Sequence, residues 1–225
     1  MFFGSLPLEE AEGALLAHGL RFAEKSFKKG HVLSAADIDL LRAEGVDSVI
    51  AARLGPDDVG EDVAADGLAG ELVGGHIEAS RAFTGRVNLF TRATGLLTYP
   101  SDHLQAFNRV DESITLAALS PFTPVVDGQM VATLKIIPFA IAARNLDIAR
   151  SVAKHGAVAL FNVMPFKPHR AGLIQTRLPG TKDNVLDKTR AVTAARLGAL
   201  NSQLVDDRVA DHTSAAVAAE ISALA

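Results

Sequence analysis

The sequence predicts an α+β first domain with a β-rich module, followed by the start of an α/β domain of three-layer (αβα) type. Between residues 80 and 141, short apolar runs recur between turn signals, which is typical of several short strands. Closer to the C-terminus the pattern becomes strand, helix, strand and helix, which indicates a parallel sheet. We therefore expect a first domain over residues 1–167 and a partial second domain over 168–225. Pro165 and Pro168 mark the boundary between them.

Composition limits the classes of protein to which the chain can belong. Hydrophobic residues make up 48% and charged residues 21% of its 225 residues, which is enough for a packed core. The formal net charge of -4 gives no basic excess, so we expect no nucleic-acid partner. Without cysteine there is neither a disulfide nor a thiolate ligand, which fits the reducing cytosol. No secretory signal and no membrane span stand out, so a cytoplasmic protein with no membrane partner is expected.

The first elements follow from helix start and stop signals. Residues 7–20 begin with a proline and acidic residues, and this predicts a short helix. A second helix should start after Ser34, a natural N-cap, with Asp37 three residues later as part of a capping box. Gly45 stands where a helix C-cap is expected, and residues 46–54 are then predicted to form a strand.

The central part should alternate between helix and short strands. Apolar spacing predicts a helix over residues 61–72. Asp127-Gly128 is a strong turn dipeptide, and the segment SDHLQAFNRVD is expected to be a helical insert. The predicted strands share β-branched and aromatic residues and lie in the segments RVNLFT, GLLTYP, ITLAAL and VATLKIIPFAI.

The last third is predicted to end in a small parallel sheet. A helix over residues 146–155 should end at Gly156, and the segment AVALFNVMPF should follow as a strand. Next come the strand AGLIQT, a loop, a helix over 185–200, a strand over 204–209 and a helix over 214–224. Two strands alone leave a bare sheet face or edge, so this segment should either dock on the preceding domain or belong to a longer protein. Exposed sheet edges also favour self-association, and we expect a homo-oligomer.

The loop from residue 176 to residue 189 is the first candidate site. It connects a strand to a helix N-terminus, which offers backbone N–H groups and a positive dipole end to an anion. Lys182 adds a positive charge. The alternative is an ordinary connection with Asp183 or Asn184 as the N-cap. Asp187 is either a residue that orients a ligand or a first-turn acid that favours the helix dipole.

Three further groups have a structural and a functional interpretation. Lys135, inside an apolar strand, either points to solvent on the polar face or meets an anion in a cleft. Thr84-Gly85-Arg86 is a turn before a strand, or a place where the backbone approaches a ligand. Asp111 and Glu112 are a capping or turn pair, or carboxylates for acid–base or metal chemistry. We favour the structural interpretation for all three groups.

The remaining chemistry-bearing residues show no known motif. The histidines lack the spacing of zinc ligands, so no metal site is expected from them. They are His18, His31, His76, His103, His155, His169 and His212. No nucleophile elbow, phosphate-binding loop of the Walker type or dinucleotide fingerprint is present, and no catalytic residue can be assigned.

Two segments together resemble a known family. The segment PLEEAEGALLAHGL, followed by KKGHVLSAADIDLLRAEGVDSV, resembles the part that precedes the ligand domain in MoeA-type molybdopterin molybdenumtransferases. The segment RAGLIQTRLPGTKDNVLDKTRAVTAARLGALNSQLVDDRVADH resembles the opening of the molybdenum cofactor biosynthesis domain. Thr176, Pro179-Gly180 and Asp187-Lys188-Thr189 stand at the family's Thr, Pro-Gly and Asp-Ser-Asn-like positions, and Asp211 lies near an expected acidic position. Arg177-Leu178 replaces the family's Gly-Asp.

The resemblance implies a function and a ligand. It implies a molybdopterin-binding protein of molybdenum cofactor biosynthesis, which takes a small-molecule pterin phosphate and for which Mg²⁺ is possible. Any enzymatic role would be that of a transferase. The implied ligand-binding residues are Thr176, Pro179, Gly180, Lys182, Asp183, Asp187, Lys188 and Thr189.

The resemblance also bears on the extent of the protein. The segments FTGRVNLFT and DGQMVATLKIIPF resemble bacterial proteins in which a molybdopterin-binding part precedes a nucleotidyltransferase-like part. We therefore expect the chain to be the N-terminal part of such a longer protein. The alternative function is a non-catalytic oligomerisation or protein-interaction module.

Overall fold

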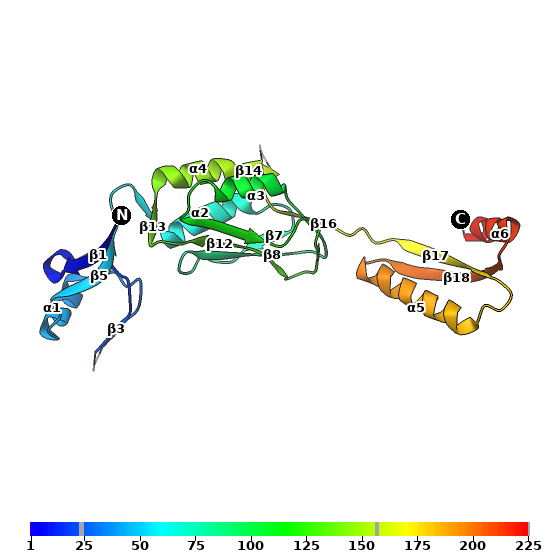
Figure 1. Cartoon of the computed structure of the whole chain (residues 1–225), viewed down its shortest axis with the longest axis horizontal. Coiled ribbons are helices and arrows are strands. Elements are labelled where there is room, and N and C mark those ends of the chain that lie inside the picture. The colour runs from blue at the N-terminus through cyan, green and yellow to red at the C-terminus, as the bar shows by residue number, and fades with distance from the viewer. Residues whose placement is uncertain (23–24, 156–157, 225) are drawn as a thin grey trace. The chain divides into compact units, whose positions relative to one another are not determined.

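The computed structural model describes residues 1–22, 25–155 and 158–224. Its chain divides into two compact units, Met1–Met164 (unit 1) and Pro165–Ala225 (unit 2), where the sequence suggested a boundary at 167/168. The described residues are a mixture of α-helices and small sheets, most of which are antiparallel (Figure 1). None of the helices in these residues combines the length and the apolar character needed to cross a membrane.

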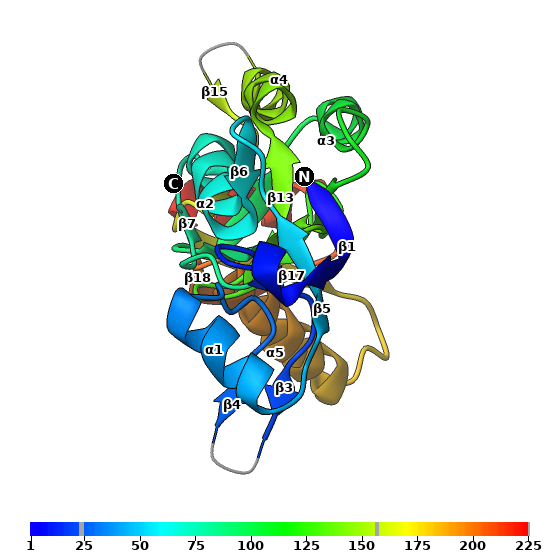
Figure 2. The same cartoon turned by 90° about the vertical axis from the view of Figure 1, so that its left-hand side faces the viewer.

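The N-terminal segment of unit 1 forms a small sheet with one helix beside it (Figure 2). Its strands and 3₁₀ helix are β1 (Phe2–Pro7), η1 (Leu8–Glu10), β2 (Leu15–Leu16), β3 (Leu20–Arg21), β4 (Ser26–Phe27) and β5 (Ser48–Arg53). Strand β5 lies between β1 and β2 and is antiparallel to both. Helix α1 (Ala35–Ala43) adds Ile38 and Leu41 to a separate hydrophobic core.

Helix α1 confirms the predicted start and stop signals. The Ser34 side chain accepts a hydrogen bond from the Asp37 backbone, and the Asp37 side chain accepts one from the Ser34 backbone, which completes the capping box. Gly45 follows the helix with a φ of 77°, the left-handed conformation that glycine adopts without steric cost.

The predicted helix over residues 7–20 is wrong. Only one 3₁₀ turn, η1, forms there, and Gly13 has a φ of 77° that interrupts any helix. The apolar side chains find partners far along the chain, since Leu15 and Leu16 pair with Ala52 and Ala51 of β5. Long-range strand pairing therefore overrides the local helix signal.

The middle of unit 1 is built on a four-stranded antiparallel sheet of order β10-β12-β8-β7. Its strands are β7 (Ile77–Ala79), β8 (Arg86–Thr91), β10 (Ile114–Ala118) and β12 (Met130–Ile136). Helices α2 (Glu61–Leu72), α3 (Ser101–Asn108) and α4 (Ala143–Ala153) lie on one side of it (Figure 1). Leu68 and Leu72 of α2 pack with Leu89 and Leu134 of the sheet in the largest hydrophobic core.

Smaller sheets complete unit 1. They contain β6 (Asp58–Gly60), β9 (Gly95–Thr98), β11 (Pro124–Val125), β13 (Ala140–Ala142), β14 (Lys154–His155), β15 (Val158–Ala159) and β16 (Asn162–Pro165). Tyr99 follows β9, packs edge-on against Phe161 and donates a hydrogen bond from its hydroxyl to the Leu119 carbonyl oxygen at 2.7 Å. The expected short strands between residues 80 and 141, the turn at Gly128 and the helical insert are confirmed. The helix expected over 146–155 ends at Ala153, and the segment AVALFNVMPF contains two short strands, β15 and β16, in place of one. Gly156 lies outside the described residues.

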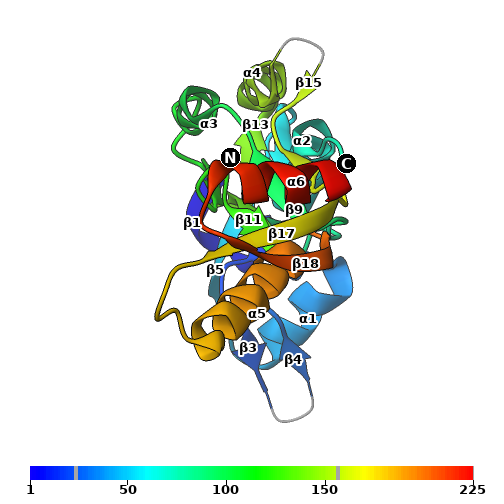
Figure 3. The ribbon, with the colours of Figure 1, turned by 90° about the vertical axis from the view of Figure 1, so that its right-hand side faces the viewer.

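Unit 2 has the strand–helix–strand–helix order that the sequence predicted. Strands β17 (Arg170–Arg177) and β18 (Gln203–Asp211) pair in parallel. Helix α5 (Asp183–Ala199) joins them, and α6 (Ser214–Leu224) follows. The two helices cover opposite faces of the strand pair (Figure 3). Few side chains of this unit are buried, among them Leu186 of α5, so its hydrophobic core is thin.

Candidate functional site

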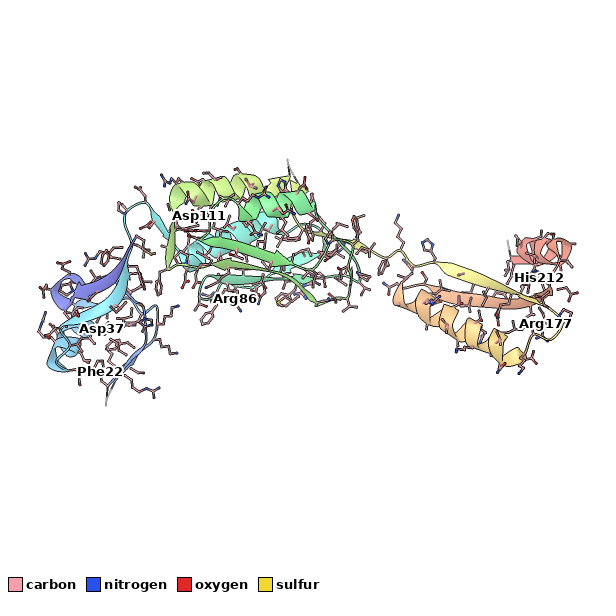
Figure 4. All side chains as sticks on the ribbon, in the orientation of Figure 1. Phe22, Asp37, Arg86, Asp111, Arg177 and His212 are labelled. Carbon is pink, nitrogen blue, oxygen red and sulfur yellow. The ribbon has the colours of Figure 1, made fainter. Side chains whose placement is uncertain are left out.

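The parallel pairing of β17 and β18 brings their carboxyl ends to one edge of the sheet. Thr176 pairs with Ala210, and Arg177 pairs with Asp211. The loop that leads into α5 and the turn that leads into α6 therefore begin side by side. Figure 4 shows Arg177 and His212 at this same end of the strand pair. In open α/β sheets, ligands bind at this edge.

A pocket of about 300 Å³ opens at this edge. Its lining combines hydroxyl, imidazole and one apolar side chain, those of Thr176, His212, Thr213, Ser214 and Val217. The Thr176 Oγ1 and His212 Nδ1 atoms lie 2.9 Å apart, so these side chains hold each other in place. The Thr213 hydroxyl accepts a hydrogen bond from the Ala216 backbone at 3.2 Å and caps the start of α6. Hydroxyls, an imidazole and a helix N-terminus can together receive an anion.

The loop before α5 is a tight turn. The Leu178 backbone donates to the Thr181 hydroxyl at 3.1 Å, and the Thr181 backbone donates to the Leu178 carbonyl at 3.0 Å. Gly180 has a φ of 88°, which a side chain would make costly. Arg177 forms an ion pair with Asp183 at 2.5 Å, which ties the end of β17 to the start of α5. Both side chains are largely exposed, so water screens the pair.

Helix α5 begins two residues earlier than the sequence suggested. Lys182 is its N-cap, without a side-chain capping bond, so the expectation that Asp183 or Asn184 would cap the helix is wrong. Asp183 is the acidic residue of the first turn, which leaves Asp187 one turn further along. The interpretation of Asp187 as a first-turn acid is therefore also wrong.

The predicted ligand-binding residues fall into three groups. Thr176 lines the pocket, while Pro179 and Gly180 form the turn. Lys182 and Asp183 stand exposed at the start of α5, and Lys182 has no ion-pair partner among the described residues. The last group, Asp187, Lys188 and Thr189, lies exposed inside α5, where the Thr189 hydroxyl donates to the Val185 carbonyl oxygen at 2.8 Å.

Sequence reasoning missed three polar residues that line the pocket beside Thr176. These are His212, Thr213 and Ser214, which follow β18. A signal for them was present, because two parallel strands must end at the same edge, and residues after the second strand then face those after the first. Asp211, which the family resemblance marked, is exposed at the end of β18.

Ion pairs hold the helices of unit 2 to the strands. Arg190 of α5 contacts Asp207 of β18 at 2.9 Å. Arg208 of β18 bridges Asp206 at 2.9 Å and Glu220 of α6 at 3.1 Å. The hydrogen bond from Arg208 lowers the pKa of the Asp206 carboxyl. These arginines are engaged in the fold. Among the other basic side chains, Lys182 lies in the loop and His212 lines the pocket.

The described residues do not form a preformed site for Mg²⁺. No three carboxylate or imidazole side chains among them are arranged to hold a metal ion. The pocket itself presents hydroxyls and one imidazole, whereas Mg²⁺ is usually held by carboxylates and substrate phosphates.

The other candidate groups lie in unit 1, where they make contacts within the fold. Lys135 is half-buried on β12 between buried Leu134 and Ile136, and its Nζ donates to the Thr84 carbonyl oxygen. Asp111 accepts a hydrogen bond from the Ser113 backbone at 2.7 Å and another from the Asn145 side chain, so it fixes the turn before β10. For Asp111 the capping interpretation is confirmed.

One comparison with known proteins gives a match. Residues 5–53 match the family described as a domain of unknown function, DUF8806. No curated protein and no solved structure gives a significant match. The DUF8806 segment contains the end of β1, all of β2, β5 and α1, and their separate core.

A buried carboxylate organises the DUF8806 segment. The Asp37 carboxylate lies 2.8 Å from Lys25 Nζ, 2.9 Å from His31 Nε2 and 2.8 Å from the Ser34 hydroxyl. The Ser34 backbone also donates to it at 3.1 Å. The hydrogen bond from Lys25, followed by those from His31 and Ser34, holds the pKa of Asp37 far below its ordinary value. This cluster ties the β3–β4 hairpin to the start of α1.

Proposed function

We propose that the chain binds molybdopterin and acts in molybdenum cofactor biosynthesis, with the ligand at the edge where β17 and β18 end. The observation that carries the proposal is the pocket in which Thr176 meets His212 beside the N-terminus of α6. Thr176 is also a residue that the family resemblance marked. We further propose that β17, β18 and their two helices belong to a three-layer αβα domain, since α5 and α6 already cover both faces.

The chemistry of the pocket suits the phosphate end of the ligand. The backbone N–H groups at the start of α6 and the hydroxyls of Thr176, Thr213 and Ser214 donate hydrogen bonds to phosphate oxygens. The His212 imidazole adds a further hydrogen bond. Lys182, exposed across the loop, supplies a positive charge. In this proposal these residues bind and orient the ligand. Any transfer reaction would use reactive groups that enter the pocket with the ligand.

A matched pair of threonine substitutions tests the site. Thr176→Val removes a hydroxyl from the pocket, whereas Thr189→Val removes one from the inner part of α5. With a phosphorylated 6-hydroxymethylpterin as the probe, the wild-type chain should melt at a higher temperature, because a ligand at a hundredfold excess over Kd adds about 2.7 kcal/mol. Thr176→Val should lose this shift and Thr189→Val should keep it.

Each other outcome has a definite meaning. If only Thr189→Val loses the shift, the ligand lies along α5, as the family resemblance alone implies, and the pocket assignment is wrong. If the wild-type chain shows no shift at any concentration of the probe, the proposed function is wrong.

A second candidate function, a homo-oligomerisation module, is favoured by exposed apolar side chains in unit 2. Val205 and Val209 of β18 remain 47% and 45% exposed, and Val185 of α5 and Ile221 of α6 are 54% and 55% exposed. Sheet edges and apolar side chains of this kind promote association. Val209→Lys should then lower the mass measured by light scattering, whereas Val63→Lys on α2 should not. An unchanged monomer mass for the wild-type chain would contradict this candidate.

A further inference from the structure

The four-stranded sheet of unit 1 has one face that the helices do not cover. Along β8, Val87, Leu89 and Thr91 are buried, while the alternate residues Arg86 and Asn88 are exposed or half-buried. In strands, alternate side chains point to opposite faces, so these polar residues lie opposite the helices. Figure 4 shows Arg86 on the side of the sheet away from α2 and α4.

The register places polar side chains of three strands next to one another on this face. Thr115 of β10 pairs with Lys135 of β12, and Lys135 pairs with Arg86 of β8. We call these three residues the cationic row. On the same face, Thr133 pairs with Asn88, and the Thr133 hydroxyl donates to the Asn88 Oδ1 atom at 2.9 Å.

Two positive charges directly opposite each other on paired strands are unfavourable unless an anion lies between them. Arg86 has no ion-pair partner among the described residues. Lys135 reaches Glu61 only at 3.8 Å. Burial raises the pKa of Glu61, and the attraction of Lys135 opposes this shift, so Glu61 compensates Lys135 and not Arg86.

The other acidic groups near this face are already engaged. Asp62 accepts a hydrogen bond from the Gly85 backbone at 2.6 Å. Glu78 lies at the far end of the face, beside Phe90, and forms an ion pair with Arg92. Neither of these groups pairs with Arg86, which is therefore the cation of the row that has no ion-pair partner among the described residues.

A turn of unusual conformation borders the cationic row. Thr84 has a φ of 49° and Gly85 a φ of 70°, and a β-branched residue rarely adopts a positive φ. The Thr84 carbonyl oxygen accepts the Lys135 hydrogen bond. A Cβ atom at Gly85 would lie 2.6 Å from the Ile136 carbonyl oxygen, so the turn packs closely against β12. Strained backbone of this kind concentrates at ligand sites.

We propose that the cationic row is a binding site for the phosphate group of a small ligand. The Arg86 guanidinium can engage two phosphate oxygens at once, and Lys135 contributes a point charge. The hydroxyl of Thr115 lies in the same row and donates a further hydrogen bond. Two cations on an acidic chain fit a single phosphate group better than a polyanion, which needs an extended basic surface. The site lies in unit 1 and is independent of the pocket in unit 2.

The test uses the full chain and matched arginine substitutions. Arg86→Gln removes a cation from the row, and Arg109→Gln removes an exposed cation at the end of α3. Inorganic phosphate and a phosphate monoester, at constant ionic strength, are titrated by calorimetry. We expect Arg86→Gln to weaken binding about tenfold or more, since hydrogen bonds to charged groups are the strong ones. Arg109→Gln should bind like the wild type.

Thermal stability without phosphate provides a second readout. Arg86→Gln relieves the repulsion from Lys135, so its melting temperature in chloride should equal or exceed that of the wild type. In phosphate the order should reverse. A purely structural role for Arg86 would instead lower the melting temperature equally in both salts, and that result would overturn the proposal.

Three outcomes separate this site from the pocket of unit 2 and from a nucleic-acid surface. Loss of phosphate binding in Arg86→Gln, with binding kept in Thr176→Val, supports the site. Loss in Thr176→Val alone assigns phosphate to unit 2 and overturns it, leaving the pterin proposal intact. Binding of a single-stranded oligonucleotide that requires Arg86, without any binding of phosphate, also overturns it.

Discussion

Asp37 is the residue whose substitution should affect the DUF8806 segment most clearly. Its side chain is 8% exposed and accepts contacts from Lys25, His31 and Ser34. Asp37→Asn keeps the shape and one acceptor but removes the charge. Hydrogen bonds to charged groups contribute about 1.5–3 kcal/mol each when buried, and the exposed ends of Lys25 and His31 reduce this. We expect the free energy of unfolding to fall by about 2 kcal/mol.

Two further substitutions, Asp37→Ala and Asp39→Asn, give losses of stability against which the effect of Asp37→Asn can be compared. Asp37→Ala also removes half of the capping box, which adds about 1 kcal/mol to the loss. Asp39→Asn lies on the same helix, but Asp39 is 76% exposed and pairs only with Arg42 at 3.1 Å. That pair contributes about 0.3–0.5 kcal/mol. For a unit of this size, 2 kcal/mol corresponds to a melting temperature about 4–8 °C lower.

The effect should depend on pH with a defined sign. The hydrogen bonds from Lys25, His31 and Ser34 lower the pKa of Asp37 in the folded chain below its ordinary value of 3.8. The unfolded state therefore takes up the proton first, and the stabilisation is fully present only above the unfolded pKa. As the pH falls from about 5 through the folded pKa, the difference between wild type and Asp37→Asn should shrink.

The assay is thermal and urea unfolding of the full chain at several pH values. Equal stabilities of Asp37→Asn and Asp39→Asn near neutral pH would refute the reasoning. So would a difference that stays constant on acidification, because it would show that the charge of Asp37 is not what stabilises the cluster.

Four further substitutions probe other parts of the chain. Gly85→Ala should cost at least about 2 kcal/mol and Gly128→Ala about 1 kcal/mol, because both have a positive φ but only the first meets a backbone oxygen; chemical unfolding should show this order. Glu61→Gln should raise stability near neutral pH, since burial raises the pKa of that carboxyl, and the gain should vanish below the ordinary pKa of 4.5. Leu186→Ala should cost unit 2 about 2–3 kcal/mol, which limited proteolysis would detect as faster cleavage of that unit.

Local signals in the sequence predicted the elements that local contacts stabilise. Ser34 and Asp37 cap α1 from within four residues, and Gly45 ends the same helix. Gly128 makes its turn because its own φ of 77° requires glycine. Such features depend on neighbouring residues, so they can be found without knowledge of the fold.

Prediction from the sequence failed where contacts between residues far apart in the chain determine the structure. Residues 7–20 have a helical start signal, but their apolar side chains pack against β5, far along the chain. The pocket is a second example. Thr176 could be predicted from its own loop, but His212 lies beside Thr176 only because β17 and β18 pair in parallel. Lys135 and Arg86 were each assessed alone, and only the register shows that they are neighbours.

Tyr99 determines which of the two units can be followed by fluorescence. It is the chain's single tyrosine, and the chain has no tryptophan. Its ring is fixed against Phe161 within unit 1. Tyrosine emission therefore comes from unit 1 alone, and unit 2 is silent in that channel. An unfolding curve recorded by emission follows only the first unit, and its separation from the curve recorded by far-ultraviolet dichroism would measure how independently the second unit melts.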